Sequence, residues 1–164
     1  MAEYNPQDPA TYGGENGNCC TTWATFRMWG PEVNPDELTV LLGIKPTESR
    51  KVGDVRGKRT FDFGMWVLST KGLGTTNLET HIQVLLDRLD ATNTSVRELI
   101  ASGKFKADIF CFWESPTRNG GPSFSPHLVA RIATLGAPLG LDIHVSDEIL
   151  EPIEYDGKFF FRTI

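Results

Sequence analysis

The segment KADIFCFWESPTRNGGPSFSPHLVARIATLG, residues 106–136, decides the fold. Its first nine residues, 106–114, are mostly apolar and aromatic, which is typical of a buried β-strand. A loop rich in glycine and proline follows. Ser125 and the proline after it then predict a helix start, because serine caps free N–H groups and proline suits the first turn. Apolar residues at helical spacing continue to Gly136, which predicts the end of the helix.

The first half of the chain repeats this order. Residues 21–29, TTWATFRMW, alternate with a period of two and predict a strand. NPDELTVLLG then opens at Asn34 and closes at Gly43, as SPHLVARIATLG opens at Ser125 and closes at Gly136. Further strands are expected at about 60–70, 139–146 and within KFFFRTI near the carboxyl end, and a helix with capping-box spacing from Thr76 to Glu79 joins the halves.

Two strand-helix-strand units predict an α+β fold. We expect a two-layer sandwich in which doubled βαβ units form a mainly antiparallel four- to five-stranded sheet, with the helices on one face, as a ferredoxin-like variant. The expected domain covers residues 21–146. Residues 1–20 are interpreted as an amino-terminal arm, and residues 147–164 as a carboxyl-terminal extension that could add a strand.

Composition narrows the class of protein. A chain of 164 residues with 40% hydrophobic residues is large enough for one self-sufficient domain. The formal net charge of −5 opposes general binding to nucleic acid or to an anionic membrane. The amino terminus lacks the basic and apolar parts of a signal peptide, and no apolar run reaches membrane-spanning length. An odd count of three cysteines favours a cytoplasmic protein with reduced thiols.

Several segments together resemble a known family. TFRMWG, NPDELTVLLGIKPTESRKVGD, WVLST, LETHIQVLLDRL, ADIFCFWES and SPHLVARIATLG, in this order and spacing, are similar to the bacterial proteins grouped as domain of unknown function 4279. The likeness covers about residues 21–146. It implies a compact α+β domain and brings no catalytic residues with it.

Strand alternation predicts which side chains share a face of the sheet, because neighbours along a strand point to opposite sides. The uncharged side chains are assigned to the side that helices cover. The other face is then aromatic and charged, and its candidate partner-binding residues are Trp23, Arg27, Trp29, Trp66, Phe110, Phe112, Glu114 and His144. Such a face is either covered by the chain ends as a second core, or used to bind a partner or ligand.

Strand alternation opposes nucleophilic catalysis, and cysteine spacing opposes metal binding. Cys111 is expected on the helix side and His144 on the other side, so the two cannot form a nucleophile-base pair. Cys19 and Cys20 are adjacent, whereas chelating cysteines usually have two to four residues between them. The sequence therefore favours a protein without catalytic activity, and we expect no metal and no cofactor.

Two loops are candidates for anion binding. Arg50, Lys51 and Arg59 lie in the basic loop 44–59, and Arg118 precedes Gly120 and Gly121 before a helix start, where free N–H groups favour negative charge. Neither loop matches a phosphate-loop or dinucleotide-binding motif.

These observations favour a non-enzymatic protein-binding domain, of the immunity, antitoxin or accessory type, that uses its aromatic sheet face. The expected partner is a protein of unknown identity, and a second copy of the chain, as a homodimer, is compatible with the sequence. The alternative is a sensor or enzyme for a small anionic ligand that uses the basic loop and the Gly-Gly loop.

Overall fold

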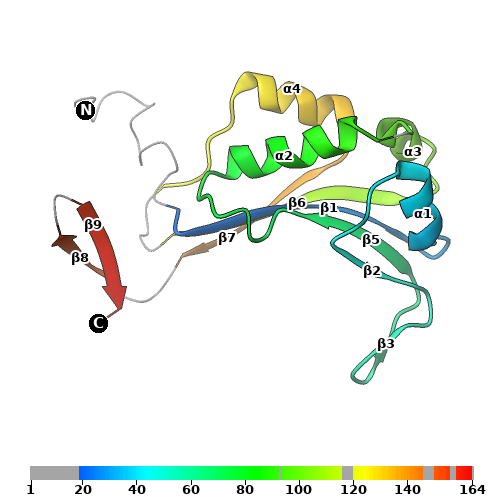
Figure 1. Ribbon diagram of the computed structural model, residues 1–164, viewed down its shortest axis with the longest axis horizontal. Coiled ribbons are helices and arrows are strands. Elements are labelled where there is room, and N and C mark those ends of the chain that lie inside the picture. Colours follow the sequence, from blue (N-terminus) through cyan, green and yellow to red (C-terminus); the bar gives the residue numbers. More distant parts are fainter. Residues whose placement is uncertain (1–18, 93, 116–119, 146–149, 156–157, 164) are drawn as a thin grey trace.

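The computed structural model describes residues 19–92, 94–115, 120–145, 150–155 and 158–163 (Figure 1). The strands are β1 (Thr21–Gly30), β2 (Glu48–Arg50), β3 (Val55–Arg56), β4 (Arg59–Thr60), β5 (Gly64–Ser69), β6 (Lys106–Ser115), β7 (Leu139–Val145), β8 (Leu150–Tyr155) and β9 (Lys158–Thr163). The helices are α1 (Pro35–Leu42), α2 (Leu78–Asp90), α3 (Val96–Ala101) and α4 (Pro126–Leu135). None of these helices is long and apolar enough to cross a membrane.

Five strands form one sheet in the order β2-β5-β1-β6-β7. All neighbouring pairs are antiparallel except β6 and β7, which are parallel. Because β5 is antiparallel to both of its neighbours, β1 and β2 run in the same direction on either side of it. The chain therefore contains two βαβ units: β1-α1-β2, which is split by β5, and β6-α4-β7, whose strands are adjacent. This mainly antiparallel α+β arrangement confirms the predicted class and is compatible with a ferredoxin-like order.

The strands that close the first unit differ from the sequence prediction. The segment 44–59, interpreted as a loop, contains β2, β3 and the first residue of β4, and the strand expected at 60–70 is shorter, as β5. The sequence of β2 is Glu-Ser-Arg, which carries no apolar alternation, so only its pairing with β5 identifies it as a strand. Near the carboxyl end, β9 pairs with β8 as a separate hairpin and not with the five-stranded sheet.

All four helices lie on one side of the sheet (Figure 1). Their apolar stripes pack on the helix-facing side chains of the central strands, and Phe26, Met28 and Ile109 are fully buried there. In α2 the stripe predicted from the sequence is buried at every position, namely Leu78, Ile82, Leu85, Leu86 and Leu89. Burying a large apolar side chain contributes roughly 1.5–3 kcal/mol, so this layer accounts for much of the stability.

The predicted helix caps are largely confirmed. Asn34 accepts a hydrogen bond from the N–H of Asp36, and Ser125 accepts one from the N–H of Leu128. Thr76 is not the cap of α2, because Asn77 occupies that position and accepts from the N–H of Thr80.

Glu79 does not act as the acidic residue of a capping box with Thr76. Its carboxylate accepts hydrogen bonds from the backbone N–H of Ser125 at 2.9 Å and from the Ser125 hydroxyl at 2.6 Å. The first turn of α2 thus holds the first turn of α4, and the two helices are connected at the residue that caps the second.

We predict that the two caps differ in strength. Asn34→Ala removes one cap bond and should lower the free energy of unfolding by about 1 kcal/mol. Ser125→Ala removes a cap bond and also the hydroxyl donor to Glu79, so it should cost about 2 kcal/mol. Urea unfolding measures both values. As a control, Glu79→Ala should cost less in the Ser125→Ala background than in the native chain, and equal costs in the two backgrounds would disprove the connection.

Candidate functional site: the open face of the sheet

The side of the sheet opposite the helices, which we call the open face, carries a set of aromatic and charged side chains. Register fixes its members, because directly paired residues share a face. Trp23 is opposite Phe112, Arg27 is opposite Asp108, and Glu114 is beside His144. Among the described residues no element covers this face, and the terminal hairpin lies beyond one end of the sheet (Figure 1).

An aromatic row crosses the open face from strand to strand. The rings of Trp23 and Phe112 are stacked with their centroids 4.0 Å apart and their planes at 12°. Phe112 stacks in turn on His144 at 4.9 Å. At the other end, the ammonium group of Lys71 lies 4.6 Å from the centroid of Trp23. The row therefore presents a continuous apolar strip with a cation at one end and an imidazole at the other.

An ion pair lies beside this row. The Arg27 guanidinium donates two hydrogen bonds to the Asp108 carboxylate, Nε to Oδ1 at 2.8 Å and Nη2 to Oδ2. The hydrogen bond to Asp108 raises the pKa of Arg27. Phe110 and Trp29 flank the guanidinium, whose central carbon is 4.6 Å and 5.9 Å from their ring centroids. These contacts hold both charges in a fixed position on the face.

A basic and aromatic corner lies at the β2 edge of the open face. The guanidinium of Arg50 lies 4.2 Å from the ring of Phe61 and 4.6 Å from the ring of Phe63, and its Nη2 contacts the sulfur of Met65. Arg59 reaches the same Phe61 ring at 5.0 Å. Within the described residues, the Nε of Arg50 is buried and has no hydrogen-bond partner.

The remaining anion-binding candidates do not join this corner. Lys51 points toward α1, where its ammonium pairs with Asp36 at 2.5 Å, and this contact raises its pKa. Arg118 lies outside the described residues. The structure thus separates the basic loop into Arg50 and Arg59, which share an aromatic ring, and Lys51, whose charge is already paired.

The predicted position of Trp66 on the open face is wrong. Trp66 pairs with Met28 in register, is fully buried on the helix side, and donates from Nε1 to the hydroxyl of Thr39 in α1. The strand β5 reads Gly-Met-Trp-Val-Leu-Ser, with apolar residues at both parities and no charge at either. Alternation therefore cannot assign its faces, whereas pairing with β1 does.

The cysteine and histidine side chains considered for catalysis are either buried or on opposite sides of the sheet. Cys111 is fully buried on the helix side, and burial raises the pKa of its thiol to about 12. His144 lies on the other side of the sheet. His81 is buried between the hydroxyl of Thr70 and the carbonyl of Thr75, which makes it a structural residue. In the parts of the chain that the structure describes, no three His, Cys, Asp or Glu side chains gather as metal ligands.

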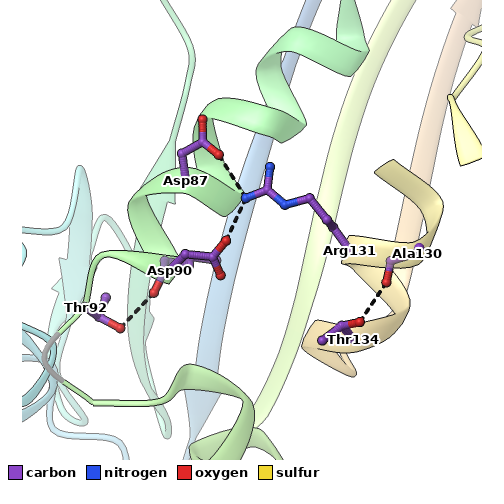
Figure 2. Close-up of polar contacts among 7 residues, drawn as sticks. Asp87, Asp90, Thr92, Ala130, Arg131 and Thr134 are labelled. Carbon is purple, nitrogen blue, oxygen red and sulfur yellow. Dashed lines mark hydrogen bonds and ion pairs between the residues drawn. The ribbon is translucent and has the colours of Figure 1, made fainter. Parts of the chain in front are cut away.

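A pocket of about 620 Å³ lies on the helix layer, between α2, α3 and α4. One arginine of its lining, Arg131, reaches from α4 to two carboxylates of α2, Asp87 at 2.9 Å and Asp90 at 2.7 Å (Figure 2). Because both carboxylates neutralise this guanidinium, we assign Arg131 a structural role in connecting α2 to α4.

Four further residues contribute to the open face and its β2 edge: Lys71, Phe61, Phe63 and Met65. The alternation that predicts Trp66 on the open face predicts Phe63 and Met65 on the helix side, and the pairing of β5 with β1 reverses it at Met65 and Trp66. Lys71 follows β5 directly, so its position over Trp23 depends on the pairing of β5 with β1. No local pattern marks it.

We predict that substitutions on the two faces have different costs. Trp66→Ala should lower the free energy of unfolding by about 3–5 kcal/mol, because it empties a buried aromatic site. Trp29→Ala and Phe112→Ala should each cost less, about 1.5 kcal/mol, because both side chains are half-buried; the first loses a cation–π contact with Arg27 and the second its stacking on Trp23 and His144. Chemical unfolding of the three variants tests this. A cost of about 3 kcal/mol or more at Phe112 would indicate that the chain ends cover the face as a second core.

We predict an order of thiol reactivity. At pH 8 Ellman's reagent should modify Cys20 first, because it is exposed, and Cys19 more slowly, because burial raises the pKa of its thiol. Cys111 should react only after unfolding. Single-serine variants of each cysteine assign the phases, and rapid modification of Cys111 in the folded protein would contradict its burial.

Comparison with known proteins places these residues in a family. Residues 19–146 match the profile of a domain of unknown function, DUF4279. This range includes every strand of the five-stranded sheet and all four helices. No curated protein and no solved structure matches the chain.

Proposed function

Since the chain belongs to DUF4279, a family of unknown function, we propose its role from the open face itself: it binds a partner protein without catalysing a reaction. The observation that carries the proposal is the stacked row of Trp23, Phe112 and His144. Aromatic side chains that are held rigidly and partly exposed are the usual anchors of protein interfaces, because they bury large areas and lose little entropy on binding.

The ion pair of Arg27 and Asp108 supports a protein partner of defined orientation. Its charges are fixed by two hydrogen bonds and by the flanking rings of Phe110 and Trp29. Charges fixed in this way favour a complementary partner and oppose others, since a like charge placed opposite them is costly. An immunity, antitoxin or accessory role fits such a binding domain, and we propose that class.

The proposal is tested by isolating the protein from its own host and identifying what remains bound, with native mass spectrometry and proteomics. Affinity for the purified partner is then measured for face variants. Trp29→Ala or Phe112→Ala should weaken binding by on the order of 2 kcal/mol, about thirtyfold, as loss of an interface anchor does. Val40→Ala is the matched control, because Val40 is 81% exposed on α1 in the helix layer. Equal affinities for all variants would exclude the open face as the binding site.

A second candidate function is the binding of a small anion at the basic and aromatic corner. The specific observation is the Arg50 guanidinium, whose Nε is buried and has no hydrogen-bond partner among the described residues, while Phe61 and Phe63 lie against it. Guanidinium groups bind carboxylates and phosphates in two-point geometry.

This candidate is tested by calorimetric titration with inorganic phosphate and with acetate. Binding should weaken with salt and be lost on replacing Arg50 and Arg59 together by Ala. Lys51→Ala is the control, since Lys51 is already paired with Asp36. Binding that survives the double variant would exclude the corner.

A further inference from the structure

The edge strand β7 exposes apolar side chains on the helix side of the sheet. Leu141, Ile143 and Val145 are 43%, 49% and 42% exposed, although their register partners on β6, Cys111, Trp113 and Ser115, are all buried. In the described part of the chain no helix covers this strip. The three residues alternate along one strand, so they form a single apolar row at the border of the sheet.

The backbone of β7 is also available along this border. In a parallel pair of strands, a residue that bonds to the neighbouring strand donates its N–H to the residue before its register partner. Its C=O accepts from the residue after that partner. Ile109 is the register partner of Leu139, and its N–H donates to the carbonyl of Pro138 at 2.8 Å. It follows that Gly140, Asp142 and His144 direct their backbone groups toward β6. The N–H and C=O groups of Leu141, Ile143 and Val145 point outward, where no other described strand pairs with them.

We propose that a second copy of this chain pairs with β7, antiparallel, about a two-fold axis at Ile143. The two five-stranded sheets then form one continuous sheet, with the same residues contributed by each copy. Exposed edges of this kind readily accept another strand, and pairing buries the apolar row that a monomer leaves in water.

Hydrogen bonding and charge together select this axis. The outward N–H and C=O groups of the two copies face each other only when the two-fold axis is centred on a residue of β7. An axis centred between two residues would pair each outward residue with one whose backbone groups point toward β6. An axis at Asp142 would oppose two carboxylates, and an axis at Leu141 would leave Asp142 opposite Gly140, which has no side chain to pair with the carboxylate.

At Ile143 the pairing is complementary at each position. Leu141 faces Val145 of the partner subunit, Ile143 faces the partner's Ile143, and Asp142 faces the partner's His144. The apolar pairs lie on the helix side and the Asp142–His144 pairs lie on the open face, because register partners share a face. Within one chain the same two side chains lie 3.0 Å apart, so the dimer would join two such pairs into one cluster.

The dimer would also extend the open face. A two-fold axis of this kind is perpendicular to the sheet, so the open faces of both copies lie on the same side. His144 ends the aromatic row within each chain. The two rows therefore meet at the axis. This inference does not rest on the proposed function, since the edge can pair whether or not the face binds another protein.

The test is sedimentation of the full chain at concentrations up to about 1 mM, where weak specific association is still detected. The native chain should form a dimer. Ile143→Pro should weaken it by at least about tenfold, because its N–H points outward and proline is tolerated at such edge positions without loss of a bond to β6. A native chain that stays monomeric throughout would overturn the proposal, including the case in which its own residues 146–164 cover the edge.

A charge exchange identifies the register. Asp142→Lys replaces the carboxylate that faces the partner's His144, and His144→Asp places a carboxylate opposite the partner's Asp142, so each substitution made singly should weaken the dimer by about tenfold. The two substitutions combined restore opposite charges and should return the dissociation constant to within about threefold of the native value. Melting temperatures of all variants monitor folding. A dimer that the single substitutions leave unchanged, or that the combined variant does not recover, would show that the copies associate elsewhere.

Discussion

The fold depends on the exclusion of water from one side of the central strand β1. Ala24, Phe26 and Met28 point to the same side and are fully buried beneath the helices. β1 pairs with β5 on one edge and with β6 on the other, so its pleat sets the faces of the whole sheet. Once these three side chains are committed to the helix side, Trp23, Arg27 and Trp29 must occupy the other side. The open face is thus a consequence of the core.

A small number of polar contacts add to the apolar packing of the helix layer. Glu79 binds the cap of α4, and Arg131 returns two ion pairs to α2 (Figure 2). His81 connects α2 to Thr70 at the end of β5, and that hydroxyl also bonds to the backbone of Ala24. The ion pairs are mostly exposed and contribute little each, whereas the buried histidine network fixes where α2 lies over β1.

The open face and the edge of β7 are connected in one respect. Apolar side chains are at least partly exposed on both, but the edge adds outward backbone groups whose spacing only another strand can satisfy. On the open face, the fixed ion pair of Arg27 and Asp108 restricts the partners that can bind. An edge with a fixed sequence of charges accepts few, and the edge of β7 is complementary to itself.

Local sequence was sufficient to predict a structural feature where a single residue or a short periodic pattern causes it. Asn34 and Ser125 cap their helices, the leucine stripe of α2 is buried, and alternation assigns the faces of β1 and β6, because charged residues occupy only one parity in each. The membership of Trp29, Phe112, Glu114 and His144 on a single face follows from the same alternation.

Tertiary structure decided what depends on pairing between distant segments. β5 is apolar at both parities, so only its register with β1 buries Trp66 and turns Met65 outward. β2 has no apolar residue, and its assignment comes from hydrogen bonds to β5. The basic loop is divided because Lys51 meets Asp36 of α1 while Arg50 meets Phe61 and Phe63. The apolar side chains of β7 are exposed because no described helix covers this edge of the sheet. The sequence by itself determined the capped helices, the strands with clear alternation and the faces whose charge pattern is asymmetric. The tertiary structure decided the rest, because side-chain periodicity is a local property, whereas register and coverage belong to the assembled sheet.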